Sequence, residues 1–202
     1  MINVNRITAS VLISFVVSGV VFAARLTLPE LASRSAPKPV HIQRMRELKL
    51  EPFEDIVARA ELILHARVNP ITTYLSDDQY DLYTDYLVSP LRVLFQKRLI
   101  VSPTPGLVQP IVITRWGGDM VINSVQVKLT DRDAPRFDPE NEVIVCLIRD
   151  AGKDKYRLVS EISGSFRLTN GVVEPFVSFT SYQRFKGMTI ESLEAEVRRM
   201  KQ

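Results

Sequence analysis

The chain has 202 residues, 46% of them hydrophobic and 24% charged, so it is long enough to bury one hydrophobic core. The single cysteine, Cys146, excludes an internal disulfide, and the two histidines, His41 and His65, are too few for a Cys/His zinc site. The formal net charge of +3 comes from residues 1–49, because residues 50–202 carry 19 basic and 21 acidic side chains, a balance that argues against a nucleic-acid partner.

Residues 7–24 form an uncharged segment between Arg6 and Arg25. As a helix with ~1.5 Å of rise per residue it would span roughly 27 Å, about one hydrocarbon core. Small residues stand at the −3 and −1 positions of a cleavage site after Ala23, so residues 1–24 are predicted to be a signal peptide or a transmembrane anchor. We expect an exported protein, periplasmic or secreted, or one anchored in the inner membrane.

A cytoplasmic signal-anchored protein is the alternative topology, because the basic residues lie after the apolar segment rather than before it. The basic stretch, residues 25–49, contains Pro37 and Pro39 and shows no persistent apolar period, so it is predicted to be a linker. The folded domain is then expected to comprise residues 50–202. Its first predicted element is a short helix after Pro52, with apolar residues at helical spacing: Phe53, Ile56, Val57 and Ala60.

From Leu62 the apolar period changes to two residues, which predicts a strand over residues 62–68. A polar loop over residues 69–79 and a second strand over residues 82–89 follow, with a bend or an end at Pro90. Later apolar runs predict further strands at residues 111–114, 125–129, 143–148, 156–159 and, around an Asn170-Gly171 hairpin turn, 166–168 and 172–173.

The chain closes with a predicted amphipathic helix that has Thr189 as its N-cap and apolar residues at spacings of three and four: Ile190, Leu193, Val197 and Met200. Seven or eight short strands without helices between them disfavour a parallel sheet. The predicted fold class is therefore mainly β: a single closed or partly closed β-barrel with a short N-terminal helix and a C-terminal amphipathic helix, preceded by the signal or anchor helix.

Several short segments of this domain carry a resemblance: Arg59-Ala60-Glu61 running into residues 62–68, Tyr83-Thr84-Asp85-Tyr86, Arg115-Trp116-Gly117-Gly118, Phe137-Asp138-Pro139-Glu140-Asn141-Glu142 and Ser163-Gly164-Ser165-Phe166. Together they resemble a group of uncharacterised exported bacterial proteins. More distantly, the order of strands is similar to the netrin-like domain of tissue inhibitors of metalloproteinases and complement C-terminal domains, an OB-type barrel. This similarity implies the fold only, because the cysteine-rich edge with which those inhibitors reach the protease zinc is absent.

Catalytic, cofactor-binding and metal-binding residues are not assigned, since the sequence has no nucleophile elbow, phosphate-binding loop or dinucleotide fingerprint. Asp131, Asp133 and Glu142 match offsets 1, 3 and 12 of a calcium loop. Pro135 and Arg136, however, stand where the loop needs an oxygen ligand and a glycine. A solvated acidic turn is expected there instead.

The aromatic residues suggest a partner-binding surface near the barrel mouth, formed by Trp116 and by the tyrosines Tyr74, Tyr80, Tyr83 and Tyr86. The other interpretation is packing in the barrel wall. We predict a non-enzymatic module, without a cofactor, that binds an unidentified protein or ligand outside the cytoplasm. The expected contacts are the loops at residues 69–79 and 102–109 and the turn at Trp116.

An enzyme of hydrolase type is the second hypothesis. Its carboxylate-based site would be assembled from residues distant in sequence, such as Asp85, Glu142 and His65. This hypothesis requires the two carboxylates to share a cleft. Cys146 is a weaker candidate, because it lies inside the apolar run 143–148 and is expected to be a buried, inert thiol.

Overall fold

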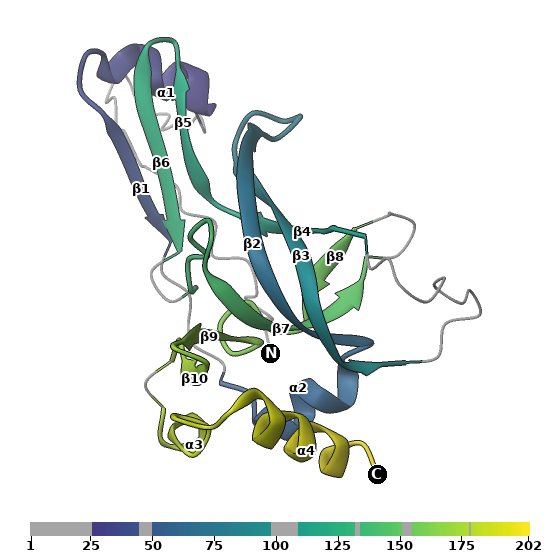
Figure 1. The fold of residues 1–202 in the computed structure, drawn as a ribbon. Helices are drawn as coiled ribbons and strands as arrows, with labels where there is room; N and C mark the ends of the chain where they lie inside the picture. Colours follow the sequence, from purple (N-terminus) through teal and green to yellow (C-terminus); the bar gives the residue numbers. More distant parts are fainter. Residues whose placement is uncertain (1–25, 45–49, 98–108, 132–133, 151–154, 178) are drawn as a thin grey trace, which may run out of the picture.

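The computed structural model describes residues 26–44, 50–97, 109–131, 134–150, 155–177 and 179–202, and it is mainly β with short helices (Figure 1). Residues 1–24, with the predicted signal or anchor, lie outside these ranges. Across the described ranges, none of the helices combines the length and the apolar character needed to cross a membrane.

The strands are β1 (Val40–Arg44), β2 (Leu62–Leu75), β3 (Leu82–Gln96), β4 (Ile111–Trp116), β5 (Gly118–Ile122), β6 (Val125–Asp131), β7 (Glu142–Arg149), β8 (Tyr156–Leu158), β9 (Ser165–Thr169) and β10 (Val172–Pro175). The helices are α1 (Leu28–Ser35), α2 (Phe53–Arg59), α3 (Thr180–Gln183) and α4 (Ile190–Met200).

Five strands form a closed ring of hydrogen-bonded neighbours in the order β2, β3, β4, β8, β7. Neighbours in the ring are antiparallel except β4 and β8, which run parallel. All five strands contribute to one buried apolar cluster, so this cluster fills the ring. Alternate residues of the same strands face outward, as the two-residue period requires.

Two helices cover the outer side of the ring where β2 and β7 pair. Ile63 of β2 and Cys146 of β7 are buried together with Phe53 of α2 and Leu193 of α4. In Figure 1, α2 and α4 lie side by side below the ring. The helices after Pro52 and Thr189, and the Asn170-Gly171 hairpin between β9 and β10, are confirmed.

The linker predicted for residues 25–49 is wrong over residues 28–35 and 40–44, which form α1 and β1. Thr27 and Glu30 complete a capping box at the start of α1, and β1 pairs in parallel with β6. The local sequence pattern is too weak to predict these two elements. Only Leu28 and Ala32 of α1 are buried, and the partner strand of β1 comes much later in the chain. Together α1, β1, β5 and β6 form a second layer, at the upper left of Figure 1.

β2 continues through most of the loop predicted at residues 69–79, so the connection to β3 is only residues 76–81. Pro70 falls within a register shift between Val68 and Ile71, where a missing N–H costs no ladder hydrogen bond. β3 likewise continues beyond Pro90 through another shift in register. Prolines at bulges therefore bend these strands without ending them.

Candidate functional site

The outer face of β2, β3 and β4 carries a row of three aromatic side chains, Tyr74, Tyr83 and Trp116, because Tyr83 is the register partner of the other two. The Tyr74 and Tyr83 rings stack with centroids 6.1 Å apart and planes at 28°. Trp116 Nε1 donates to Asp81 Oδ1 at 2.7 Å, and the Arg44 guanidinium lies 5.0 Å from the centroid of the Trp116 ring. All three aromatic residues are half-buried, and burial raises the pKa of Tyr83.

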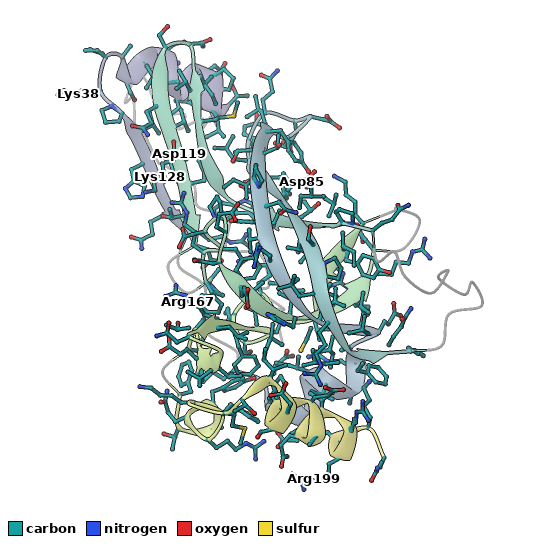
Figure 2. The ribbon with its side chains drawn as sticks, viewed as in Figure 1. Lys38, Asp85, Asp119, Lys128, Arg167 and Arg199 are labelled. Carbon is teal, nitrogen blue, oxygen red and sulfur yellow. The ribbon has the colours of Figure 1, made fainter. Side chains whose placement is uncertain are left out.

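A polar network around Asp85 adjoins this row on the same face. Thr114 Oγ1 donates to Asp85 Oδ1 at 2.6 Å, and Lys155 Nζ lies 2.7 Å from Asp85 Oδ2. Tyr74 also donates its hydroxyl to Asp85 Oδ1 at 3.5 Å, while the Lys155 ammonium lies 5.6 Å from the centroid of the Tyr74 ring. The hydrogen bond to Asp85 raises the pKa of Lys155. These contacts fix the orientation of Tyr74; Figure 2 labels Asp85 on β3.

The structure places three of the five predicted aromatic residues, Tyr74, Tyr83 and Trp116, in this row. Tyr80 lies instead in the β2–β3 turn, where its backbone N–H donates to Asp78 Oδ1 at 3.2 Å. Tyr86 is buried inside the ring. Sequence reasoning missed Lys155, because no local pattern links the start of β8 to β3.

Of the three residues of the hydrolase hypothesis, His65 and Glu142 meet, whereas Asp85 lies apart from them. His65 Nε2 and Glu142 Oε2 are 2.9 Å apart, and Arg67 donates to Glu142 Oε1 at 3.1 Å. These hydrogen bonds lower the pKa of Glu142. Asp85 pairs with Thr72 of β2, whereas Glu142 pairs with Arg67. At ~3.3 Å per strand residue this separation along β2 is roughly 16 Å, so the structure forms no carboxylate pair from Asp85 and Glu142.

Among the described residues, no group of three or more His, Cys, Asp or Glu side chains is arranged to hold a metal ion. Asp133 of the acidic turn lies outside the described ranges. Cys146 is fully buried as predicted, and burial raises the pKa of its thiol to about 12. The thiol is therefore protonated at neutral pH and shielded from solvent.

A cavity of about 300 Å³ lies on the opposite side of the β2–β3 ribbon, between the ribbon and the β5–β6 hairpin. Its lining includes Thr73 and Thr84 of the ribbon and Lys128 of β6. Gly117 and Gly118 form the corner from β4 to β5, with φ of +96° and +151°. A Cβ on Gly118 would come within 2.5 Å of the Thr73 and Thr84 side chains, so only glycine allows this close approach.

Comparison with known proteins yields no family assignment. No protein-family model matches the chain, and no curated protein matches it. The resemblance to exported proteins with a netrin-like barrel accordingly stays a prediction.

Proposed function

We propose that the chain is an exported or membrane-tethered, non-enzymatic binding module built on an OB-type β-barrel, and that it contacts a protein or another ligand outside the cytoplasm. The ring order supports the barrel assignment, because five strands close through one parallel pair, β4 and β8. In OB-type barrels the face of the second and third strands, with the loops beside it, binds ligands. β3 and β4 occupy those positions here, with Lys155 at the end of a neighbouring loop.

The aromatic row of Tyr74, Tyr83 and Trp116 is the single observation that carries this proposal. Half-exposed tyrosine and tryptophan side chains provide apolar contact area together with a polar group, which suits a protein interface. Here the Asp85–Lys155 ion pair and the bond from Trp116 to Asp81 hold the rings in place. Pre-organised side chains lose less conformational entropy when a partner binds.

Binding is proposed rather than hydrolysis, because both carboxylates of the hydrolase hypothesis are already engaged by neighbouring side chains. Asp85 is held by Lys155 and Thr114, and Glu142 by His65 and Arg67. The cavity lining includes neither carboxylate. The proposed face carries the cations Lys155 and Arg44 beside the carboxylates of Asp85 and Asp81, so it is not strongly basic. This balance supports a partner other than nucleic acid.

A photo-crosslinking amino acid at Thr72, an exposed residue beside Asp85, tests the proposed face in living cells. We expect a discrete crosslinked product that disappears when Tyr83→Ala is added. The matched control carries the crosslinker at Arg199, on α4 at the far end of the molecule (Figure 2). The proposal fails if both positions give the same products, or if Tyr83→Ala leaves the Thr72 product unchanged in a folded protein.

Export is tested separately by the mass and the N-terminus of the protein recovered from fractionated cells. A product beginning at Ala24 in the soluble extracytoplasmic fraction supports secretion. An intact chain in the membrane supports an anchor at residues 7–24, and protease accessibility of the domain in spheroplasts then decides its side. A domain protected inside the cytoplasm overturns the proposed location.

A further inference from the structure

We propose that the cavity between the β2–β3 ribbon and the β5–β6 hairpin binds a small organic anion that carries hydroxyl groups, such as a sugar acid or an open-chain hydroxy acid. This site is distinct from the outer face, because side chains alternate along each strand. Thr73 and Thr84 line the cavity, whereas their neighbours Tyr74 and Tyr83 form the aromatic row. Trp116 borders both.

The size and walls of the cavity suit a small ligand. Its volume of about 300 Å³ lies at the lower end of the range of small-molecule sites. Ile71, Tyr86 and Leu129 contribute apolar surface that can contact carbon atoms of a ligand. The close approach of Gly118 to Thr73 and Thr84 closes one wall, so its shape is set by packed backbone.

The cations at the cavity favour an acidic ligand. Lys128 is the register partner of Asp119, but the Asp119 carboxylate accepts from Gln126 Nε2 at 3.2 and 3.3 Å instead. Within the described part of the chain, the Lys128 ammonium group forms no ion pair. Figure 2 shows Lys128 and Asp119 on the same hairpin. A ligand carboxylate can therefore form with Lys128 the ion pair that no side chain of the hairpin forms.

Arg115 adds a second positive charge, and it is held rigidly. Its side chain is 6% exposed and donates to the backbone carbonyls of Pro135 and of Glu161, the latter at 3.1 Å. Arg136, the third cation of the lining, already pairs with Asp138 at 3.7 Å, and the lining also contains the carboxylates of Asp119 and Asp131. The preference for an anion therefore depends on the Lys128 ammonium group rather than on the net charge.

Oxygen atoms beside these cations can accept hydrogen bonds from the hydroxyl groups of a ligand. Thr84 donates to the Gly117 carbonyl at 2.7 Å and lies 3.1 Å from the Thr73 hydroxyl, so its oxygen retains an acceptor site. Thr130 and the Asp131 carboxylate also line the cavity, and a carboxylate accepts up to four hydrogen bonds. Cations together with several acceptors match a molecule that has both a carboxylate and hydroxyls.

The test titrates the isolated full chain with four probes while amide resonances are followed by NMR: D-glucuronate, D-gluconate, D-glucose and acetate. We expect at least one of the first two to shift amides of β5, β6 and the ribbon, with at least tenfold tighter binding than glucose or acetate. Preference for glucuronate identifies a sugar ring, and preference for gluconate an open chain. The proposal is overturned if neither acid binds, or if glucose or acetate binds equally well.

Two substitutions locate the binding. Lys128→Gln is expected to weaken binding of the preferred acid at least tenfold, whereas the matched control Lys186→Gln, an exposed lysine after α3, leaves it unchanged. The dispersion of amide resonances shows whether Lys128→Gln keeps the fold. If it does not, Thr130→Val provides a second test, and this variant is expected to weaken binding several-fold. Equal affinity of Lys128→Gln and wild type, or an effect of Lys186→Gln alone, overturns the assignment.

Discussion

Glu142 connects two side chains of β2, because its carboxylate is held by His65 and by Arg67. These hydrogen bonds lower its pKa in the folded state. A depressed folded pKa contributes stability that is present above the ordinary value of 4.5 and is lost as the pH falls below it. The acid limb of the stability curve should therefore depend on this residue.

We predict that Glu142→Gln lowers the free energy of unfolding by about 1 kcal/mol at pH 7. The difference from wild type should shrink as the pH falls through 4.5 and below. Urea unfolding at neutral and acidic pH measures both effects. Glu196→Gln, which removes a more exposed pair with Arg199, is the control and should change stability less. A deficit that persists unchanged at pH 3 would contradict the linkage.

A comparison of Gly118 with Gly171 separates the effect of side-chain contact on stability from the effect of backbone strain. Both have positive φ, but a Cβ at Gly118 would collide with Thr73 and Thr84, whereas a Cβ at Gly171 meets nothing within 4 Å. Gly118→Ala should destabilise by about 3 kcal/mol or more, and Gly171→Ala by about 1 kcal/mol. Chemical denaturation decides between these values, and equal losses at the two sites would show that the packed corner is unimportant.

Individual residues of the candidate site could be predicted only where they share a strand. Alternation along the second predicted strand places Tyr83 and Asp85 on one face. Their neighbours Trp116 and Lys155 come from β4 and from the residue before β8, and the register between strands is set by tertiary pairing. The aromatic candidates were therefore recognisable by type, whereas the ion pair that fixes Tyr74 was not.

At the scale of elements, polar contacts dock the terminal helix α4 onto β3 and α2. Arg92 of β3 contacts Glu191 at 2.6 Å and the nearly buried Glu194 at 2.5 Å. The Lys201 ammonium, just after α4, donates to the carbonyls of Ala58 and Ala60 at the end of α2. The helix therefore contributes cations and anions as well as its apolar face to the interface.

Arg92→Gln is predicted to destabilise the protein by about 2 kcal/mol, because it removes a charged partner from a nearly buried carboxylate. Amide hydrogen exchange in α4 of this variant should be faster than in wild type under conditions in which the rest of the protein stays folded. Arg199→Gln on the same helix is the matched control, since Arg199 is exposed and pairs with Glu196, and it should leave the stability close to that of wild type. Equal effects of the two variants would exclude docking through Arg92.

Elements with strong local signals were predictable, and elements defined by distant pairing were not. Pro52, Thr189 and the Asn170-Gly171 turn mark their helices and hairpin directly. β5 was missed because it begins at Gly118, and the far half of β2 because Pro70 suggests a loop. In both cases pairing with a neighbouring strand outweighs a residue that is unfavourable in isolated strands.

For the whole molecule, the two-residue spacing of apolar residues predicted a mainly β fold, but it could not show where that fold begins. The described structure extends the packed region to Leu28, because α1 and β1 bury apolar residues against β5 and β6. Val40 and Ile42 of β1 pair with Val127 and Leu129 of β6. A boundary at residue 50 would remove one strand of a three-stranded sheet and the helix that covers it.

Truncation tests this boundary. A chain that begins at residue 50 loses the buried side chains Leu28, Ala32 and Val40 and exposes Val127 and Leu129. We expect it to be less stable by about 4 kcal/mol or more and to bind a hydrophobic dye in native buffer. The control begins at residue 26 and should unfold at the same urea concentration as the full chain. If the chain from residue 50 matches that control in unfolding midpoint and dye binding, α1 and β1 are peripheral and the domain begins after them.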